Sequence, residues 1–432
     1  MKIGVIGTGF VFDLYMNTLG RHPDLEIVGI ADSSAERAAT VGRFYGLKVY
    51  PSNEALLSDP AVEAVANFTS IESHYEVSKE ALLAGKHVYS EKPLTMRLDE
   101  ARDLVALAEE RGLRLSCAPS NVLSASVQTL WKAVADGAVG TPRIVYAEFD
   151  DNPVPKLSPE TWRSRSGAPW PYLHEYEMGC TWEHAGYHLA WMCAIFGPVR
   201  SVTAFSHVTM PDKTDLPLDP PDTPDFSVAS LAFESGVVGR MTCSIAAPSD
   251  HRMRIIGSDG VVSADTYRNY DCPVRLEPFA PISLKARNMR IVRQNSVLQW
   301  IFGVGGRKVP LVPAVHPGVG TGRRRGLSPK AWLKSFLRSQ YGEQDKTAGL
   351  AEMAAALREG RDQFPPHAFT LHLTELTLAI QSAGPGGATH SMETRFDPLP
   401  MPPATARAAD YRRWRRPGVV ARAVSGIARL TR

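Results

Sequence analysis

Cysteine is scarce in this sequence and never falls in a recognisable motif. The five cysteines are odd in number and widely spaced, and no two of them have the spacing of a redox pair or of metal ligands. A disulfide framework and a zinc-binding module are therefore not expected. We expect buried free thiols in a reducing compartment.

Long apolar runs and internal repeats are also missing. The longest apolar stretch, Leu189 to Phe196, is far shorter than the roughly 20 residues that cross a bilayer. The opening Met1-Lys2-Ile3-Gly4 has the pattern of a strand and lacks the features of a secretory signal, so we expect a cytoplasmic protein. A chain of 432 residues without repeats exceeds what one core usually supports, which predicts at least two unique domains.

Acidic residues are absent from one long segment and nearly absent from another. Between Ala280 and Gln340 there are twelve Lys or Arg and no Asp or Glu, and from Arg407 to Arg432 there are eight Arg and one acid, Asp410. Such positive segments suit an anionic substrate group or an anionic membrane surface, and a solvated loop at a subunit contact is the simplest alternative. Nucleic acid is not expected, because no binding module is recognisable.

The end of the second basic segment has a further pattern. Apolar residues recur at helical spacing beside Arg422 and Arg429, namely Val420, Val424, Ile427 and Leu430. This stripe is typical of an interfacial amphipathic helix, and packing within an oligomer accounts for it equally well.

The first 120 residues alternate short β-branched runs with amphipathic ones, as repeated βαβ units do. We expect strands at Lys2–Ile6, Glu26–Ala31, Ala64–Phe68, His87–Ser90 and Arg114–Cys117. Apolar residues at helical spacing predict helices at Ser34–Tyr45, Ser73–Ala84 and Leu98–Arg111. The pattern predicts an α/β Rossmann domain with a doubly wound parallel sheet over residues 1–122.

Beyond a helix at Ala125–Asp136 the pattern changes. Strand-like runs follow one another with only one helix, near Glu183–Phe196, among them, which favours an open, predominantly antiparallel sheet in an α+β domain. The strands are expected at Arg143–Phe149, Ser201–Val208, Phe226–Phe233, Val237–Ser244 and Met253–Gly257. We assign residues 123–400 to this domain, with a partly mobile basic insert at 280–340 and helices near Lys346–Glu359 and Phe369–Ser382. A basic tail, 401–432, completes the chain.

A glycine turn directly follows the first expected strand. Gly7-Thr8-Gly9-Phe10 opens a helix, and Asp32 ends the second strand, where a ribose-binding acid is expected. Two glycines allow a tight turn, and the helix N-terminus suits a pyrophosphate, although Phe12 stands where a third glycine is usual. Asp32 with Ser33 and Ser34 favours NAD over NADP, while Arg37, one helical turn on, keeps NADP open.

Glu91-Lys92-Pro93 follows the fourth expected strand. Ligands of open parallel sheets bind at the carboxyl ends of the strands, so Lys92 is expected beside the nicotinamide. A lysine there can hydrogen-bond a substrate oxygen and stabilise negative charge on it. A surface turn is the ordinary alternative for this tripeptide.

Together these motifs resemble the Gfo/Idh/MocA family of oxidoreductases, named after glucose-fructose oxidoreductase and inositol dehydrogenase. The resemblance covers residues 1–275 and returns at Asp345–Ala383. It implies that Lys92 contacts substrate and nicotinamide, that Asn121 lines the active site, that Trp162-Arg163 precedes the catalytic helix, and that the C-terminal sheet mediates homo-oligomerisation. The cofactor-binding residues that motif and resemblance predict are Gly7, Thr8, Gly9, Phe10, Asp32, Ser33, Thr69, His74, Glu91, Lys92 and Asn121.

The family's second catalytic element is a helix carrying Asp, Gly and His. His188 falls on the catalytic histidine, but His184 replaces the aspartate. The resemblance predicts that Lys92, His188 and His184 are catalytic and that the substrate contacts these three with Asn121, Trp162 and Arg163. His184 and His188 could form a proton relay with Glu183, or His184 could bind substrate. A metal pair and two core histidines are the alternatives, and we expect no metal.

The sequence thus predicts an NAD-dependent oxidoreductase that moves a hydride between nicotinamide and a secondary alcohol of a sugar, cyclitol or glycoside. One alternative is a redox-neutral epimerase or eliminase that retains its NAD. An alternative from another class is a regulatory dinucleotide-binding protein in which the altered His184 motif has abolished catalysis.

Overall fold

The N-terminal part of the chain forms a five-stranded parallel sheet in the order β2-β1-β3-β4-β5. The structure is a computed structural model, and it describes residues 1–318, 344–415 and 423. The strands are β1 (Lys2–Ile6), β2 (Glu26–Ala31), β3 (Ala64–Asn67), β4 (His87–Ser90) and β5 (Leu115–Cys117). The helices between them are α1 (Phe10–Leu19), α2 (Ala35–Tyr45), α3 (Asn53–Leu57), α4 (His74–Leu83) and α5 (Leu98–Glu110).

The strand order shows at which point of this sheet a ligand can bind. The chain runs from β1 to β2 on one side and reaches β3 on the other, so the order reverses between β1 and β3. Loops diverge at such a point and leave room for a ligand beyond the carboxyl ends of the strands. The glycine turn after β1 and the loop after β3 both lie there.

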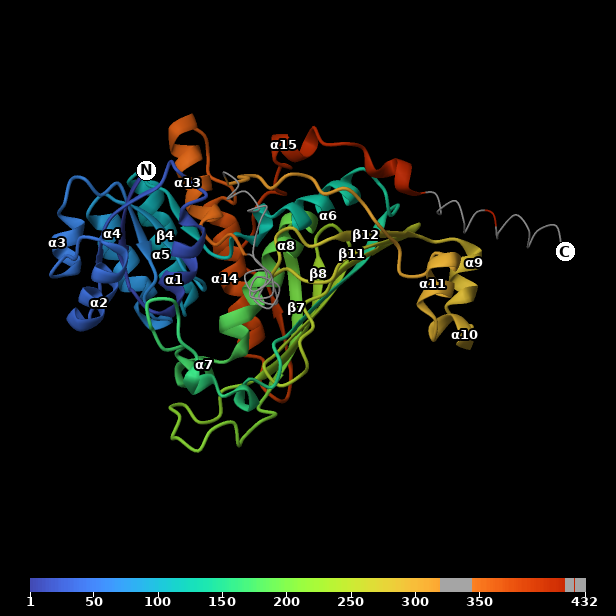
Figure 1. Cartoon of the computed structure of the whole chain (residues 1–432), viewed down its shortest axis with the longest axis horizontal. Helices are drawn as coiled ribbons and strands as arrows, with labels where there is room; N and C mark the ends of the chain where they lie inside the picture. The colour runs from blue at the N-terminus through green and yellow to red at the C-terminus, as the bar shows by residue number, and fades with distance from the viewer. Residues whose placement is uncertain (319–343, 416–422, 424–432) are drawn as a thin grey trace, which may run out of the picture.

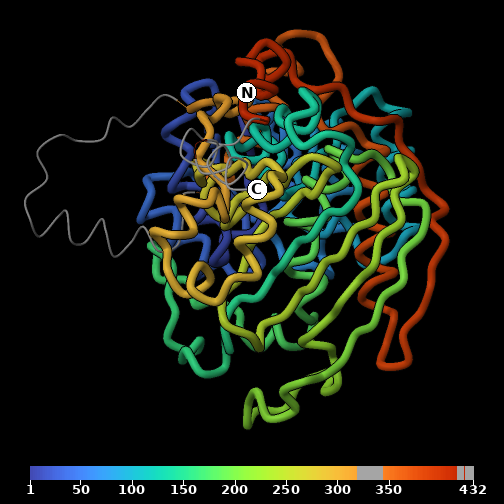
Figure 2. The backbone as a smooth tube through the Cα atoms, turned by 90° about the vertical axis from the view of Figure 1, so that its right-hand side faces the viewer, coloured from blue at the N-terminus to red at the C-terminus, as the bar shows by residue number. Residues whose placement is uncertain are grey.

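The second sheet has nine strands in the order β13-β12-β11-β10-β6-β9-β8-β7-β14, and Figure 2 shows its strands running side by side. Only β6 and β9 are parallel neighbours; the other pairs are antiparallel. The strands are β6 (Pro142–Asp150), β7 (Val199–His207), β8 (Phe226–Phe233), β9 (Val238–Ser244), β10 (Met253–Gly257), β11 (Gly260–Ala264), β12 (Val274–Pro278), β13 (Arg307–Lys308) and β14 (Ala388–Ser391). The expected fold class, a Rossmann domain followed by a mostly antiparallel sheet, is confirmed.

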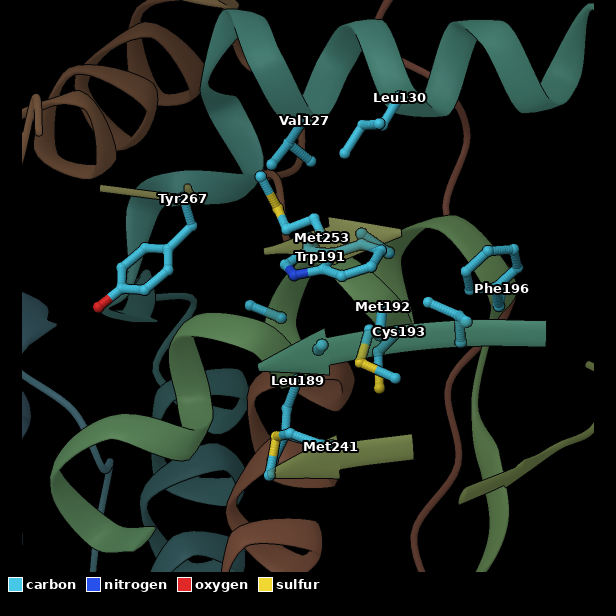
Figure 3. Close-up of a cluster of buried hydrophobic side chains, with 14 of the residues drawn as sticks. Val127, Leu130, Leu189, Trp191, Met192, Cys193, Phe196, Met241, Met253 and Tyr267 are labelled. Carbon is cyan, nitrogen blue, oxygen red and sulfur yellow. The ribbon is translucent and has the colours of Figure 1, made fainter. Parts of the chain in front are cut away.

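Helices pack against this sheet around a large apolar core. Trp191 lies at its centre, fully buried, with Met253 and Val127 around it (Figure 3). The helices of this part are α6 (Ala125–Ala135), α7 (Tyr172–Met178), α8 (Gly186–Phe196) and α14 (His367–Gln381), and a π-helical turn, η5 (Thr181–Ala185), leads into α8. Because η5 and α8 contain every residue of the predicted histidine motif, this core decides where each histidine points.

The chain returns to the first domain after the basic insert. In α13 (Ala348–Glu359), Leu350 and Met353 belong to the same apolar cluster as β1 and α1. The turn before α13 is fixed to α1, because Thr347 Oγ1 lies 2.7 Å from Thr18 Oγ1 and donates to the carbonyl oxygen of Tyr15. Residues 345–347 are therefore held beside the second half of α1, in a domain that precedes them by more than 300 residues.

The basic segments are more ordered in their described parts than the sequence indicates. Where a mobile insert is expected, the chain forms three short helices, α9 (Pro281–Ala286), α10 (Arg290–Arg293) and α11 (Ser296–Phe302), and then β13. The tail begins with α15 (Pro403–Ala406) and the short helix η7 (Tyr411–Arg415). Residues 319–343 and the apolar stripe of the tail lie outside the described residues. The remaining short 3-10 helices are η1 (Ile71–Ser73), η2 (Ser120–Leu123), η3 (Val154–Leu157) and η4 (Pro159–Thr161).

In the ranges 1–318 and 344–415, no helix is both long enough and apolar enough to span a bilayer.

Candidate active site

The glycine turn after β1 has two glycines with different physical roles. Gly7 has a φ of +95°, and a Cβ there would lie 2.5 Å from the backbone of Phe68, so the neighbouring strand end requires glycine. Gly9 precedes the first turn of α1, and nothing lies within 4 Å of where its Cβ would be. The N-terminus of α1, with Phe10 as its first residue, therefore faces open space, which suits a pyrophosphate.

Asp32 supports this turn from the end of β2. Its Oδ2 accepts hydrogen bonds from the backbone N–H and the hydroxyl of Thr8, both at 2.7 Å, and its Oδ1 accepts from Ser34 N at 2.8 Å. Ser34 caps α2, which leaves Asp32 free of that task, and Ser33 is exposed beside it. The carboxylate thus lies next to the predicted ribose position.

Arg37 gives an independent indication that a ligand fits here. Its Nε donates to the Thr8 carbonyl oxygen at 3.0 Å, while its Nη2 is buried without a hydrogen-bond partner among the described residues. A buried, unsatisfied guanidinium N–H is unfavourable and suits a site that a polar ligand completes. The turn, Asp32 and Arg37 together fit an adenine dinucleotide.

Lys92 emerges at the end of β4 and is held by two carboxylates. Its backbone N–H donates to Glu91 Oε2 at 3.1 Å, and its Nζ donates to Glu183 Oε2 at 2.5 Å. Glu183 belongs to η5, so this ion pair joins the two domains. Lys92 also lines a pocket with Pro93, Trp182 and residues of α14.

A second lysine, which the sequence reasoning missed, completes the group. Lys346 Nζ lies 3.4 Å from Glu91 Oε1 and donates to the Tyr187 hydroxyl at 3.1 Å. Lys92 Nζ lies 6.0 Å from the centre of the Tyr187 ring. We call Glu91, Lys92, Glu183, Tyr187 and Lys346 the lysine cluster.

Both lysines of the cluster are cations over the working range of pH. Burial alone would lower the pKa of Lys92, but Glu183, Tyr187 and Glu91 outweigh it and raise the pKa above its usual value. Burial opposes the charge of Lys346 as well, and Glu91 and Tyr187 raise its pKa. The pKa of Glu91 is lowered despite its burial, because Lys346 and Lys92 lie beside it. Lys92 is therefore a charged hydrogen-bond donor at this site.

His188, the predicted catalytic histidine, lies in the core of the C-terminal domain. Its ring is fully buried, Nε2 bonds to the Glu148 carbonyl oxygen at 2.7 Å, and Nδ1 accepts from the Trp191 indole at 2.8 Å. Trp191 itself is in the centre of the C-terminal core (Figure 3). Burial lowers the pKa of His188 to about 3, so the ring stays neutral. The structure therefore does not bring His188 together with Lys92.

The rotation of the helix accounts for the position of His188. Neighbouring helical residues point about 100° apart, whereas residues four apart share a face. Glu183 and Tyr187 form the face toward Lys92, and His184 and His188 form the face toward β6. His184 stacks on Phe149 with ring centres 4.4 Å apart and bonds to Glu175, so it too lies on the sheet side.

Three of the predicted cofactor contacts lie around the cluster in different ways. Thr69 follows β3 at the reversal point, partly exposed, with its hydroxyl bonded to Asn67. His74 is buried, with Nδ1 at 2.6 Å from the Pro93 carbonyl oxygen and Nε2 at 3.2 Å from that of Thr69, so it positions both loops. Asn121 is buried and donates to the Tyr187 carbonyl oxygen at 2.6 Å. Both buried side chains hold neighbouring segments in place, Asn121 Oδ1 has no hydrogen-bond partner among the described residues, and the cofactor contacts of His74 and Asn121 stay predictions.

Trp162 and Arg163 lie in a loop that reaches the first domain at another point. The Trp162 indole donates to Leu157 and Arg163 to Glu160, both within their own segment. Farther along this loop, Ser164 and Ser166 donate to the buried carboxylate of Asp13 on α1. The loop therefore covers α1 near the glycine turn, and none of the described contacts joins Trp162 or Arg163 to the lysine cluster.

The signals for the missed residues were weak. Tyr187 directly precedes the predicted His188, so the motif did point to its helix. Lys346 contacts Glu91 across 255 residues and carries no local pattern. Only the folded chain brings it to the site.

A parallel sheet with a glycine turn after β1 and a lysine at the end of β4 defines a dinucleotide-binding enzyme of the oxidoreductase class. Comparison with known proteins agrees with this. Residues 1–118 match the "Oxidoreductase family, NAD-binding Rossmann fold", and residues 127–263 match the "GFO/IDH/MocA C-terminal domain". The chain belongs to the GFO/IDH/MocA family of oxidoreductases, and its first domain is an NAD-binding domain.

Individual relatives are similar over most of their length. An uncharacterised oxidoreductase of Synechocystis is 25% identical over 74% of this chain and 90% of its own. UDP-N-acetylglucosamine 3-dehydrogenase of Acidithiobacillus ferrooxidans is 28% identical over 62% and 75%. The fold resembles that of the WlbA dehydrogenase from Bordetella pertussis, solved with NADH and UDP-GlcNAcA, with a TM-score of 0.64, 18% identity, and coverage of 91% and 97%.

Proposed function

We propose that this protein transfers a hydride between NAD and a secondary alcohol of a sugar-like substrate, with Lys92 and Tyr187 acting on the reacting oxygen. The observation that carries the proposal is the lysine cluster: two cations and a phenol lie together at the carboxyl end of the NAD-binding sheet. The substrate class is supported by one relative, a UDP-N-acetylglucosamine 3-dehydrogenase.

The glycine turn, Asp32 and Arg37 would hold the adenosine and pyrophosphate parts of NAD. When bound, NAD supplies the hydride acceptor for oxidation, or the hydride donor for reduction in its reduced form. Because NAD carries the hydride, the residues of the chain have to move the proton of the substrate oxygen. The two positively charged lysines lie where they can assist this proton transfer.

The residues of the cluster divide this task. Lys92 donates a hydrogen bond to the reacting oxygen and stabilises negative charge on it. When the carbonyl form is reduced, the Tyr187 hydroxyl gives its proton to that oxygen, and the Lys346 ammonium stabilises the phenolate that remains. In oxidation the alcohol proton returns to Tyr187. Glu183 and Glu91 hold the lysines in place.

The proposed proton-transfer role thus moves from His188 to Tyr187. His188 has no free ring nitrogen, because one bonds to a carbonyl oxygen and the other accepts from an indole. To act on a substrate it would have to leave the core. Tyr187 needs no such movement, since it is already bonded to Lys346 at 3.1 Å.

The test is a panel of sugars, cyclitols, glycosides and nucleotide sugars, monitored by nicotinamide absorbance with NAD and with its reduced form. We expect turnover with one class and its loss in Lys92→Met, while NAD still binds in calorimetry. Tightly bound NAD with turnover that needs no added cofactor would instead support the redox-neutral alternative. NAD binding without turnover of any panel member would support the regulatory one.

A further inference from the structure

The segment after β12 forms a separate projection from the large sheet. The chain leaves β12, forms α9, α10 and α11, and returns as β13 beside the strand it left. In Figure 1 these helices lie beyond β12, at the end of the molecule opposite α2 and α3 of the NAD-binding domain. We call residues 281–302 the outer lobe.

The outer lobe has its large apolar side chains on the outside. Its buried side chains are small or medium-sized: Ser283, Ala286 and Val292. Of the eleven large hydrophobic side chains that are exposed in the described ranges, five belong to this lobe: Leu284, Met289, Ile291, Val297 and Trp300. Trp300 is 69% exposed, more than any of the others. Such a concentration of apolar side chains on a solvent-exposed surface indicates a contact site.

Specific hydrogen bonds hold the lobe in this arrangement. Asn295 caps α11, because its Oδ1 accepts from the N–H groups of Val297 and Leu298 at 3.0 Å. The Gln299 side chain donates to the Arg293 carbonyl oxygen, and Arg287 forms an ion pair with Glu277 of β12. These contacts fix the helices of the lobe, so the exposed position of the apolar side chains is part of the folded structure.

The charge of the lobe indicates what it contacts. Lys285, Arg290 and Arg293 form no ion pair with any described residue, and the sequence has no Asp or Glu from Pro278 to Gly342. A second copy of the lobe would bring like charges together, which is unfavourable. An anionic surface would instead complement them.

We infer that the outer lobe docks the enzyme onto an anionic phospholipid surface. Trp300 and Ile291 enter the interfacial layer, which tryptophan favours, and Lys285, Arg290 and Arg293 contact lipid phosphates. Near a negatively charged leaflet, each such cation strengthens the binding of the protein to the membrane. With the lobe on the membrane, the NAD-binding domain at the far end of the molecule stays in water (Figure 1). This inference does not depend on the proposed reaction.

The experiment is vesicle sedimentation of the full chain. Vesicles of phosphatidylcholine with phosphatidylglycerol are compared with vesicles of phosphatidylcholine alone. We expect binding to the anionic vesicles only, weakening as salt is added. The triple variants Ile291→Ser/Val297→Ser/Trp300→Ser and Lys285→Glu/Arg290→Glu/Arg293→Glu should each lower the affinity at least about tenfold.

Matched controls carry the same changes elsewhere. Apolar side chains exposed outside the lobe are replaced in Leu83→Ser/Leu216→Ser/Val238→Ser, and exposed cations outside it in Arg43→Glu/Arg111→Glu/Lys156→Glu. Both controls should bind as the wild type does. NAD affinity reports whether each variant is folded. A second measurement is the quenching of tryptophan fluorescence by brominated lipid. This quenching should be weaker in Trp300→Phe than in the wild type, and the single substitution alters the lobe less than the triple variants do.

Three results would overturn the inference. One is no binding of the wild type to anionic vesicles. Another is binding that the lobe variants and the controls reduce equally. The third is sedimentation velocity showing that the lobe variants separate an oligomer into single chains while vesicle binding is unchanged, which would assign the surface to a contact between copies.

Discussion

The helix through η5 and α8 has two faces whose environments differ sharply. Glu183 and Tyr187 face the NAD-binding domain and meet two lysines, whereas His184 and His188 face the sheet and meet Glu175, Phe149 and Trp191. Tyr187 belongs to a charged, partly exposed site, whereas the next residue, His188, lies in the core, and His184 is partly exposed on the sheet side. The comparison shows that the chemistry of a helical motif depends on which face of the helix the packing turns toward the site.

Replacing Tyr187 tests this difference most strongly. Tyr187→Phe removes only the hydroxyl that bonds to Lys346, and loss of a general acid typically lowers turnover by about 10²- to 10⁴-fold. His188→Gln keeps a donor for Glu148 and an acceptor for Trp191, so its turnover should stay within a few-fold of the wild type. Steady-state kcat on the substrate found in the panel measures both. A large loss in His188→Gln alone would reverse the assignment of the two faces.

Lys92→Met should have the next largest effect. The variant keeps a side chain of similar length but removes the donor to the reacting oxygen, and such a donor is worth about 10²- to 10³-fold in kcat. NAD affinity from calorimetry should change little, because the glycine turn is intact. Retention of full turnover would show that the reaction occurs away from the lysine cluster.

Lys346→Met should act more mildly, because Lys346 acts through Tyr187. A hydrogen bond to a charged group is worth about 1.5–3 kcal/mol, or roughly 10- to 100-fold in turnover. The loss should appear in kcat while KM changes little, because the ammonium stabilises the phenolate formed during the reaction and does not bind the substrate. Lys79→Met, which removes a surface lysine paired with Asp103, is the matched control and should behave as the wild type. An unchanged kcat in Lys346→Met would argue against its contact with Tyr187 in the working enzyme.

The burial of His188 should affect how the free energy of unfolding depends on pH. The pKa of His188 is about 3 when folded, against about 6.5 unfolded, so between these values the unfolded chain binds a proton that the folded chain does not. Stability contributed by the neutral ring is present above pH 6.5 and decreases as pH falls. From pH 7 to pH 5 the wild type should lose about 2 kcal/mol more than His188→Gln in urea unfolding. The exposed His207→Gln should lose as much as the wild type, and equal losses in all three proteins would place His188 in solvent.

The sequence sufficed for the first domain and for half of the site. The strands from β1 to β5 and the helices α2, α4 and α5 follow local patterns, whereas the short helix α3 was not predicted. Lys92 was found because the end of a parallel strand fixes a residue's place without knowledge of its neighbours. These features depend on short stretches of chain.

The rest depends on packing over long distances. Whether Tyr187 or His188 faces Lys92 is set by how α8 rotates against β6 and Trp191, and the motif is compatible with both. Lys346 arrives after a basic insert, and its place is fixed by Thr347 against Thr18. The helices of the outer lobe were missed because their exposed apolar residues do not give the pattern of a buried helix face.

A crystal structure of the enzyme with NAD and its substrate tests the account most directly. We expect Lys92 Nζ and Tyr187 Oη both within about 3.2 Å of the reacting oxygen, with the nicotinamide on the other side of that carbon. His188 should remain bonded to Glu148 and Trp191. A complex in which His188 has turned out of the core to reach the substrate, or in which the substrate lies away from Lys92, would contradict the account.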